Sequence, residues 1–279
     1  MEYRLAQRFG GRGFAPHQFR QALRGVAVDG GGRLHAVGDS VVKVFDPDGT
    51  LLRQWATGQP GESAAVDDEG RVWVGQDGQV EIFSPEGERV DSRRDPGRLG
   101  LVTAVGFGGG DVFLADATAR WVRRYGSDGS LLNNIGDQHR KGGFHIPNGV
   151  VDFAVDDGGV LHVANPGMHR VERYSPDGTL LGRFGRFDGQ DPAGFPGCCN
   201  PTNLTVDDQG RVIVSEKAGP RVKVYDPDGE LLTVVAAGVF DPGAKNMDLA
   251  VDAHGRLYVA DTATLEICAF EPTGREATA

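Results

Sequence analysis

The sequence has few cysteines, few basic residues and no long apolar run. Only three of its 279 residues are cysteine, so disulfides cannot form a framework for the fold. Lys and Arg number 29 against 39 Asp and Glu, and the net charge of −10 disfavours binding to nucleic acid or to anionic membranes. No apolar run reaches the length of a membrane span, and the N-terminal segment lacks the basic and apolar regions of a secretory signal. We therefore expect a cytoplasmic protein, or an extracytoplasmic one if a signal peptide has been removed.

What the sequence has in abundance is turn residues, with 43 glycines and 15 prolines. They separate short β-branched runs in a unit that recurs six times, as in "GVAVDGGGRLHAV…VVKVFDPDGTLLRQW" and "NLTVDDQGRVIVS…RVKVYDPDGELLTVV". Each unit predicts four short antiparallel strands joined by tight turns. Such a unit, repeated every roughly 40–50 residues, is typical of a β-propeller blade. The six predicted blades cover approximately residues 25–60, 61–98, 99–138, 146–190, 200–240 and 246–279.

The ring needs one more strand to close. The sixth unit has only a weak fourth strand, "REATA", at residues 275–279, whereas the N-terminal "YRLAQRFG" resembles "LLGRFG" at 180–185, the fourth strand of unit four. We predict that residues 3–9 form the outermost strand of blade six. The expected architecture is a single all-β domain, residues 1–279, folded as a six-bladed β-propeller of four-stranded antiparallel blades and closed by the N-terminal strand.

The segments "VANPGMHRVERY", "VSEKAGPRVKVY" and "VAVDGGGRLHAV" resemble NHL repeats, and the resemblance covers essentially the whole chain. It implies a propeller fold, and NHL propellers include enzymes, peptide binders and RNA binders. The WD40 alternative lacks its Trp-Asp signature here. The segment "FHIPNGVVDFAVDDGGVLHVAN", at His145, is similar to the repeat of NHL-type peptidyl-hydroxyglycine lyases. Asn203 and Asp248 loosely match metal ligands of gluconolactonase-like propellers.

In a propeller the first strand of each blade lines the central channel, so equivalent positions of the six units can be compared. Four residues before the Asp of each "V-D" the chain carries Gly25, Ser63, Asp152, Asn203 and Asp248. Unit three has "GFGGG" in place of Val-Asp, and Thr103 is its equivalent residue, with a one-residue ambiguity in the alignment. Two carboxylates and an amide on neighbouring strands could ligate a hard cation such as calcium. The alternative is that these side chains hydrogen-bond the ends of neighbouring strands and fill the channel with water.

Longer loops fall on one side of the ring. Insertions precede the first strands of units four and five, at 136–151 and 185–201, and the same units have unusual second-to-third loops, at 165–170 and 216–221. Extra length on one face of a repeat protein marks a binding side. We expect a small molecule, metal or peptide to bind at this upper face, on the following residues: His145, Asn165, His169, Arg170, Cys198, Cys199, Asn200, Glu216, Lys217 and Arg221. For the two arginines the alternative is a structural role in the repeat.

The adjacent Cys198 and Cys199 leave four interpretations open. With His145 or His169 they could bind copper or zinc, since thiolate and imidazole suit these metals. They could form a vicinal disulfide that locks the turn. One could be a nucleophilic thiolate activated by a neighbouring His or Lys. They could also be a reduced, buried pair that acts as small apolar residues.

Three classes of function follow from these residues. The first is a module that binds a small polar ligand or a metal ion at the upper channel mouth over blades four to six. The second is a metal-dependent lyase or hydrolase that uses the same site, with His145 or His169 as ligand or base and Arg221 or Lys217 holding an anionic substrate group. The third is a scaffold for protein–protein interaction. Apart from a metal ion, no cofactor is expected.

Overall fold

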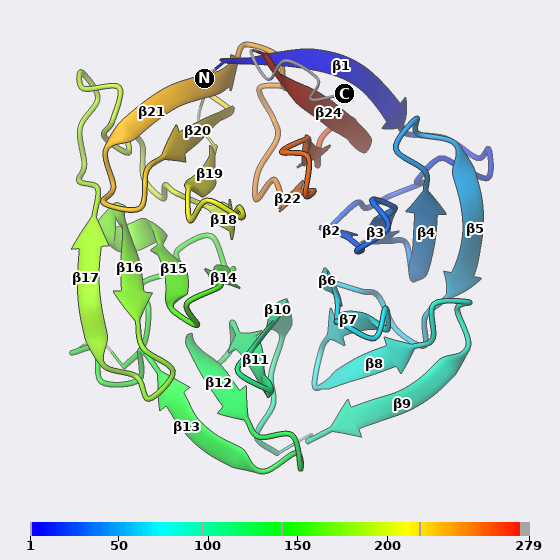
Figure 1. Cartoon of the computed structure of the whole chain (residues 1–279), viewed down its shortest axis with the longest axis horizontal. Coiled ribbons are helices and arrows are strands. Elements are labelled where there is room, and N and C mark those ends of the chain that lie inside the picture. The colour runs from blue at the N-terminus through cyan, green and yellow to red at the C-terminus, as the bar shows by residue number, and fades with distance from the viewer. Residues whose placement is uncertain (1, 96, 141, 218, 274–279) are drawn as a thin grey trace.

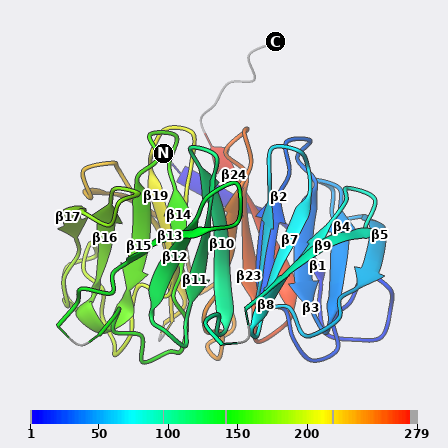
Figure 2. The ribbon, with the colours of Figure 1, turned by 90° about the horizontal axis from the view of Figure 1, so that it is seen from below.

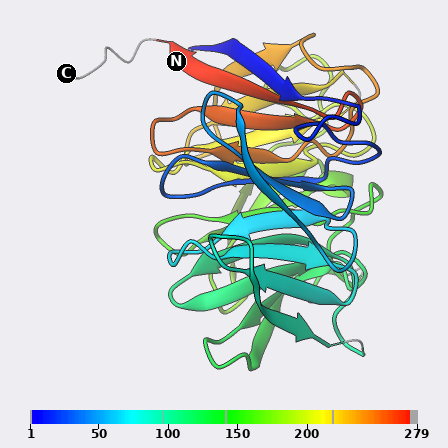
Figure 3. The same ribbon diagram turned by 90° about the vertical axis from the view of Figure 1, so that its right-hand side faces the viewer.

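The computed structural model shows six four-stranded antiparallel sheets arranged around a central axis (Figure 1), which confirms the predicted all-β propeller. It describes residues 2–95, 97–140, 142–217 and 219–273. The strands run through the thickness of the ring, and the loops therefore lie on two opposite faces (Figures 2 and 3). We call the upper face the one that carries the loops before each first strand and between each second and third strand.

The first three blades follow the chain without interruption, each ordered from the channel outward. Their strands are β2 (Gly25–Val28), β3 (Leu34–Gly38), β4 (Val41–Phe45) and β5 (Leu51–Ala56) in blade one; β6 (Ser63–Val66), β7 (Val72–Gln76), β8 (Gln79–Phe83) and β9 (Arg89–Arg94) in blade two; and β10 (Val102–Gly108), β11 (Asp111–Asp116), β12 (Trp121–Tyr125) and β13 (Leu131–Ile135) in blade three.

The remaining blades continue in the same order, except that the outermost strand of blade six comes from the N-terminus. Their strands are β14 (Phe153–Val155), β15 (Leu161–Asn165), β16 (Arg170–Tyr174) and β17 (Leu180–Phe184) in blade four; β18 (Asn203–Val206), β19 (Val212–Glu216), β20 (Arg221–Tyr225) and β21 (Leu231–Ala237) in blade five; and β22 (Leu249–Val251), β23 (Leu257–Asp261), β24 (Glu266–Thr273) and β1 (Glu2–Gly10) in blade six.

The repeated "V-D…G" motif builds the turn between the first and second strands on the lower face. Asp29 directly follows β2, the first strand of blade one, and its Oδ1 accepts the backbone N–H groups of Gly31 and Arg33 at 2.9 and 3.0 Å. The glycine that completes the turn, Gly32, has φ of 75°, a conformation that a side chain disfavours. Unit three has "GFGGG" in this place and forms a two-residue hairpin instead, because Gly109 and Gly110 both have positive φ.

The ring closes as predicted. β1 pairs antiparallel with β24, from Glu2 opposite Thr273 to Gly10 opposite Glu266 (Figure 1). The Phe9 ring lies over Gly49, and its centroid is 5.1 Å from that of Phe45 in blade one. Phe184, in the outermost strand of blade four, makes the equivalent contacts with blade five: it lies over Gly229, 5.0 Å from the Tyr225 ring. The predicted weak strand at 275–279 lies outside the described residues.

The core is divided among the interfaces between blades. Separate clusters of buried Val, Ile, Leu and aromatic side chains fill these interfaces, one of them joining blade six to blade one through Tyr258 and Phe45. Each blade buries both faces of its sheet only because a neighbour covers each, which is why the ring must be complete. None of the described helical segments has the length and apolar character needed to cross a bilayer.

Candidate functional site

The six equivalent channel positions share one register in the structure. Gly25, Ser63 and Asn203 each pair with the residue before the last of the second strand, which is Val37, Gly75 and Ser215 respectively. Asp152 and Asp248 occupy the same place, because their carbonyls accept the N–H groups of Ala164 and Ala260. Thr103 falls at an irregularity between Val102 and Ala104, which explains the one-residue ambiguity of the alignment in unit three.

Most of these residues tie their own blade to the first strand of the next. The Ser63 hydroxyl donates to the Val102 carbonyl at 3.3 Å, and that of Thr103 donates to the Val151 carbonyl at 2.7 Å. The two carboxyls do the same with their Oδ2 atoms: that of Asp152 accepts the Leu204 N–H at 2.8 Å, and that of Asp248 accepts the Val26 N–H at 2.7 Å. Gly25 has no side chain and lies directly against the Ser63 and Ala64 backbone. The predicted role in joining neighbouring first strands is therefore present.

Asn203 differs from the other five. It is 4% exposed, and its Oδ1 has no hydrogen-bond partner among the described residues. The link from blade five to blade six is made instead by Ser215, whose hydroxyl donates to the Met247 carbonyl at 2.7 Å. A buried amide oxygen without a protein partner is costly unless a water or a ligand binds to it.

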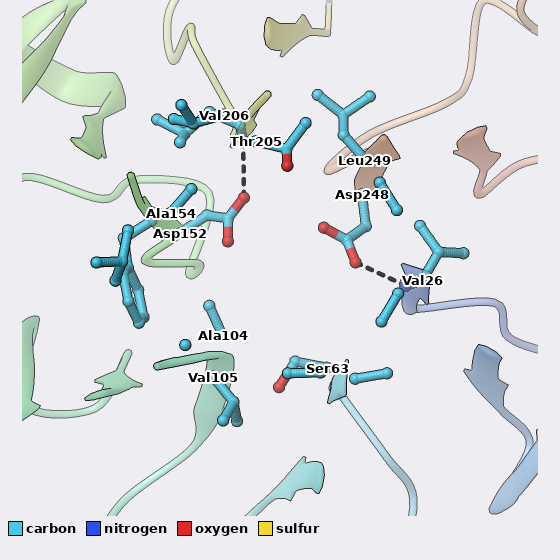
Figure 4. A pocket seen from close by; sticks show the side chains of 18 of the residues that line it. Val26, Ser63, Ala104, Val105, Asp152, Ala154, Thr205, Val206, Asp248 and Leu249 are labelled. Carbon is cyan, nitrogen blue, oxygen red and sulfur yellow. Dashed lines mark hydrogen bonds between the residues drawn. The ribbon is translucent and has the colours of Figure 1, made fainter. Parts of the chain in front are cut away.

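Asp152 and Asp248 face one another across the channel on either side of the Asn203 strand (Figure 4). Asp152 is 4% exposed, and Asp248 is partly buried. Burial, and then the charge of Asp248, raise the pKa of Asp152 well above its ordinary value. Burial raises the pKa of Asp248 to about 7. Hydrogen bonding from the Asn203 side chain lowers both pKa values, against the effect of burial, which places this amide beside both carboxyls. The pair therefore retains a proton near neutral pH.

A cavity of about 250 Å³ runs along the axis below these carboxyls. All six first strands line it, and small or apolar side chains such as Ala64, Val105 and Val206 form most of its wall (Figure 4). Asp152 and Asp248 are the two carboxyl-bearing residues among those that line it. The channel thus offers room for several waters and concentrates negative charge at its upper end.

The loop sector predicted over blades four and five is assembled by hydrogen bonds between its loops. The His145 N–H donates to Asn165 Oδ1 at 3.1 Å, which joins the 136–151 insertion to the 165–170 loop. His169 Nδ1 lies 3.1 Å from the Phe195 carbonyl, which joins that loop to the 185–201 insertion. The Lys217 N–H donates to Asn200 Oδ1 at 2.9 Å, which joins this insertion to the 216–221 loop.

Four of the predicted binding residues are committed to contacts inside the protein. Asn165 and Glu216 are buried at the ends of second strands. Arg170 Nε donates to Glu172 Oε1 at 2.6 Å, Arg221 donates to Glu216, and Lys223 Nζ lies 2.8 Å from the same carboxylate. The geometry therefore favours the structural role for both arginines.

The two histidines of the sector have the same arrangement. Nδ1 of His145 lies 3.2 Å from the Gly167 carbonyl, and Nδ1 of His169 lies 3.1 Å from the Phe195 carbonyl. Because only a protonated nitrogen can donate to a carbonyl, Nε2 carries the lone pair in the neutral ring of each. Histidines that bind metals or act as bases are commonly anchored in this way.

The cysteines lie in the same sector, at the turn that leads into β18. Cys198 is exposed and Cys199 is buried. Among the described residues, no group of three or more His, Cys, Asp and Glu side chains is placed to hold a metal ion. The assignment of copper or zinc to Cys198, Cys199, His145 and His169 stays a prediction.

Sequence reasoning missed a buried polar cluster in blade four. Glu172 is fully buried, and His139 Nε2 lies 3.0 Å from its Oε2 while Tyr174 donates to the same oxygen. Burial alone would raise the pKa of Glu172, but the hydrogen bonds of His139, Tyr174 and Arg170 lower it to about 2. The one signal in the sequence was a Glu in the middle of a third strand, in "RVERY". This cluster fixes the 136–151 insertion to blade four.

Comparison with known proteins supports the fold and no more. Neither a family model nor a curated protein matches this sequence. Among solved structures, it is similar to streptogramin B lyase, with a TM-score of 0.66 and 8% identity over 96% of this chain and 97% of that one. It is also similar to a protein of unknown function from Bacteroides thetaiotaomicron, with a TM-score of 0.67 and 17% identity over 94% of this chain and 72% of that one. The WD40 propeller domain of Doa1 gives a TM-score of 0.63 and 14% identity over 99% of this chain and 98% of that one. The NHL family therefore remains a resemblance of motifs.

Proposed function

We propose that this propeller binds a hard divalent cation, such as calcium, at the upper mouth of its channel through Asp152, Asn203 and Asp248. The observation that supports it best is the buried Asn203 Oδ1, which lacks a partner within the described part of the chain, while equivalent residues of other blades are bonded to their neighbours. Two neighbouring carboxyls alone would be equally consistent with a bound cation and with a proton shared between them. The amide oxygen adds a third ligand of the kind that calcium prefers.

The hydrogen bonds of the carboxyls are compatible with this role. Asp152 and Asp248 each use Oδ2 to accept a backbone N–H of the next blade, so a cation would be held by the other oxygens without breaking the ring. Waters of the channel would complete the six to eight ligands of calcium. A cation also removes the repulsion that otherwise keeps the pair partly protonated, so binding should release a proton.

The test compares calcium binding by calorimetry and by thermal shift in three proteins. The double variant Asp152→Asn/Asp248→Asn keeps an oxygen that can accept the Leu204 and Val26 N–H groups, but removes both charges. The control, Asp68→Asn/Asp157→Asn, removes two charges from exposed positions. We expect calcium to raise the melting temperature of the wild type and the control, and the affinity to fall at least about tenfold in the double variant. Equal shifts in all three proteins, or none at about 10 mM calcium, would contradict the proposal.

A metal-dependent lyase or hydrolase is the second candidate, and the anchored imidazoles of His145 and His169 favour it. Each presents Nε2 as a ligand or base on the face where the channel opens. If these nitrogens bind zinc, the variant His145→Ala/His169→Ala should lose zinc binding while retaining calcium binding. His17→Ala, at an exposed histidine, should retain both. Unchanged zinc binding in the double variant would exclude this site.

A further inference from the structure

The two adjacent thiols lie in unequal surroundings. Cys198 is exposed, whereas Cys199 is 4% exposed, and their sulfur atoms are 3.0 Å apart. The thiol of Cys199 donates to Cys198 Sγ. This hydrogen bond and, secondly, the positive charge of Lys217 lower the pKa of Cys198, while burial raises the pKa of Cys199. The exposed sulfur is therefore the one that forms a thiolate more readily.

The turn that carries the pair is held on both sides by one buried amide. Asn200 Nδ2 donates to the carbonyls of Pro196 at 2.6 Å and Lys217 at 2.9 Å, and its Oδ1 accepts the Lys217 N–H at 2.9 Å. Asn200 is fully buried, so water does not compete for these bonds. They fix the backbone directly after Cys199 and keep Lys217 beside the thiols.

We propose that Cys198 and Cys199 form a peroxide-reactive dithiol that closes to a vicinal disulfide. In the first step the Cys198 thiolate attacks one oxygen of a hydroperoxide, the O–O bond breaks, and the leaving oxygen takes a proton to become an alcohol or water. Cys198 is then a sulfenic acid. In the second step Cys199 sulfur attacks Cys198 sulfur, the S–O bond breaks, and water leaves with the Cys199 proton. The two sulfurs lose two electrons in total, and the hydroperoxide gains them.

The third cysteine provides an internal control. Cys268 is fully buried in blade six, where Arg8 donates to its sulfur at 3.2 Å. Burial raises the pKa of this thiol to about 12, despite the neighbouring Arg8. Its thiolate is scarce at neutral pH and its sulfur is shielded from solvent, so it should not react with peroxide in the folded protein.

The experiment treats the reduced, full-length protein with one equivalent of hydrogen peroxide at pH 7, then counts thiols after denaturation and measures the mass. We expect three free thiols to become one, with a mass loss of about 2 Da in a monomer. Peptide mapping should place the bond between Cys198 and Cys199. Cys268→Ser should form the same bond, and Cys198→Ser should form none.

The Cys199→Ser variant tests the order of the steps. Here Cys198 should stop at the sulfenic acid, which dimedone traps as a covalent adduct. Circular dichroism shows whether each variant folds. The thiol count and the mass of the oxidised wild-type protein test the proposal even if a variant does not fold. Three remaining thiols, over-oxidation of Cys198 with Cys199 still free, or a disulfide between two chains would each overturn the proposal.

Discussion

Ring closure through β1 places Phe9 at the interface between blade six and blade one, and its truncation gives a direct prediction. The Phe9 ring belongs to blade six but lies 5.1 Å from the Phe45 ring and over Gly49, both in blade one. Truncating a fully buried Phe costs about 3–5 kcal/mol. Phe9 is half-buried, so we expect Phe9→Ala to lower the free energy of unfolding by about 2 kcal/mol.

For a chain of this size, such a loss lowers the melting temperature by roughly 4–8 °C. The matched control is Leu5→Ala, on the same strand but 38% exposed, which should cost less than about 0.5 kcal/mol. Deletion of residues 1–10 should remove the outer strand of blade six altogether and abolish cooperative melting. Thermal and denaturant unfolding measure all three. If Phe9→Ala and Leu5→Ala lower the free energy of unfolding equally, or if the deletion variant melts like the full chain, then β1 does not close the ring as described.

Two further predictions concern blade contacts and pH. A Cβ at Gly25 would lie 2.8 Å from the Ala64 nitrogen and the Ser63 Cα, so Gly25→Ala should lower the free energy of unfolding by about 1–3 kcal/mol. A Cβ at Gly30 would meet nothing within 4 Å, so the control Gly30→Ala should be nearly neutral. Chemical denaturation measures both variants. Because the pKa of Glu172 is about 2, below that of the unfolded chain, its stabilisation is present above about pH 4.3 and is lost as the pH falls toward 2. Glu172→Gln should flatten the dependence of stability on pH in that range, and an unchanged slope would show that Glu172 is not ionised in the folded protein.

The repeat pattern predicts the fold well because each blade is specified locally. Alternating β-branched residues, the Asp that closes the lower turn in every unit except unit three, and the glycines with positive φ act within one unit, so the six copies support one another. The similarity of "YRLAQRFG" to "LLGRFG" predicts closure for the same reason, since Phe9 and Phe184 fill equivalent places over Gly49 and Gly229.

The site is less predictable because its chemistry depends on which atoms are already bonded. The alignment places Asp152, Asn203 and Asp248 at one level of the channel, but only the structure shows that no described residue donates a hydrogen bond to Asn203 Oδ1. Nor could spacing show that Glu216 would be neutralised by Arg221 and the buried Lys223. These bonds join residues of different strands, and nothing in the local pattern distinguishes a paired carboxylate from a free one.

The most direct test of cation binding is the number of protons released when calcium binds at pH 7. Calorimetry in two buffers of different ionisation enthalpy gives this number. Because the pKa of Asp248 is about 7 and that of Asp152 is raised, calcium should displace a proton from the pair, and its affinity should rise with pH from about 6 to 8. The Asp152→Asn/Asp248→Asn variant should show neither effect. Calcium binding to the wild type without proton release, or proton release that persists in the variant, would contradict a cation held between these two carboxyls.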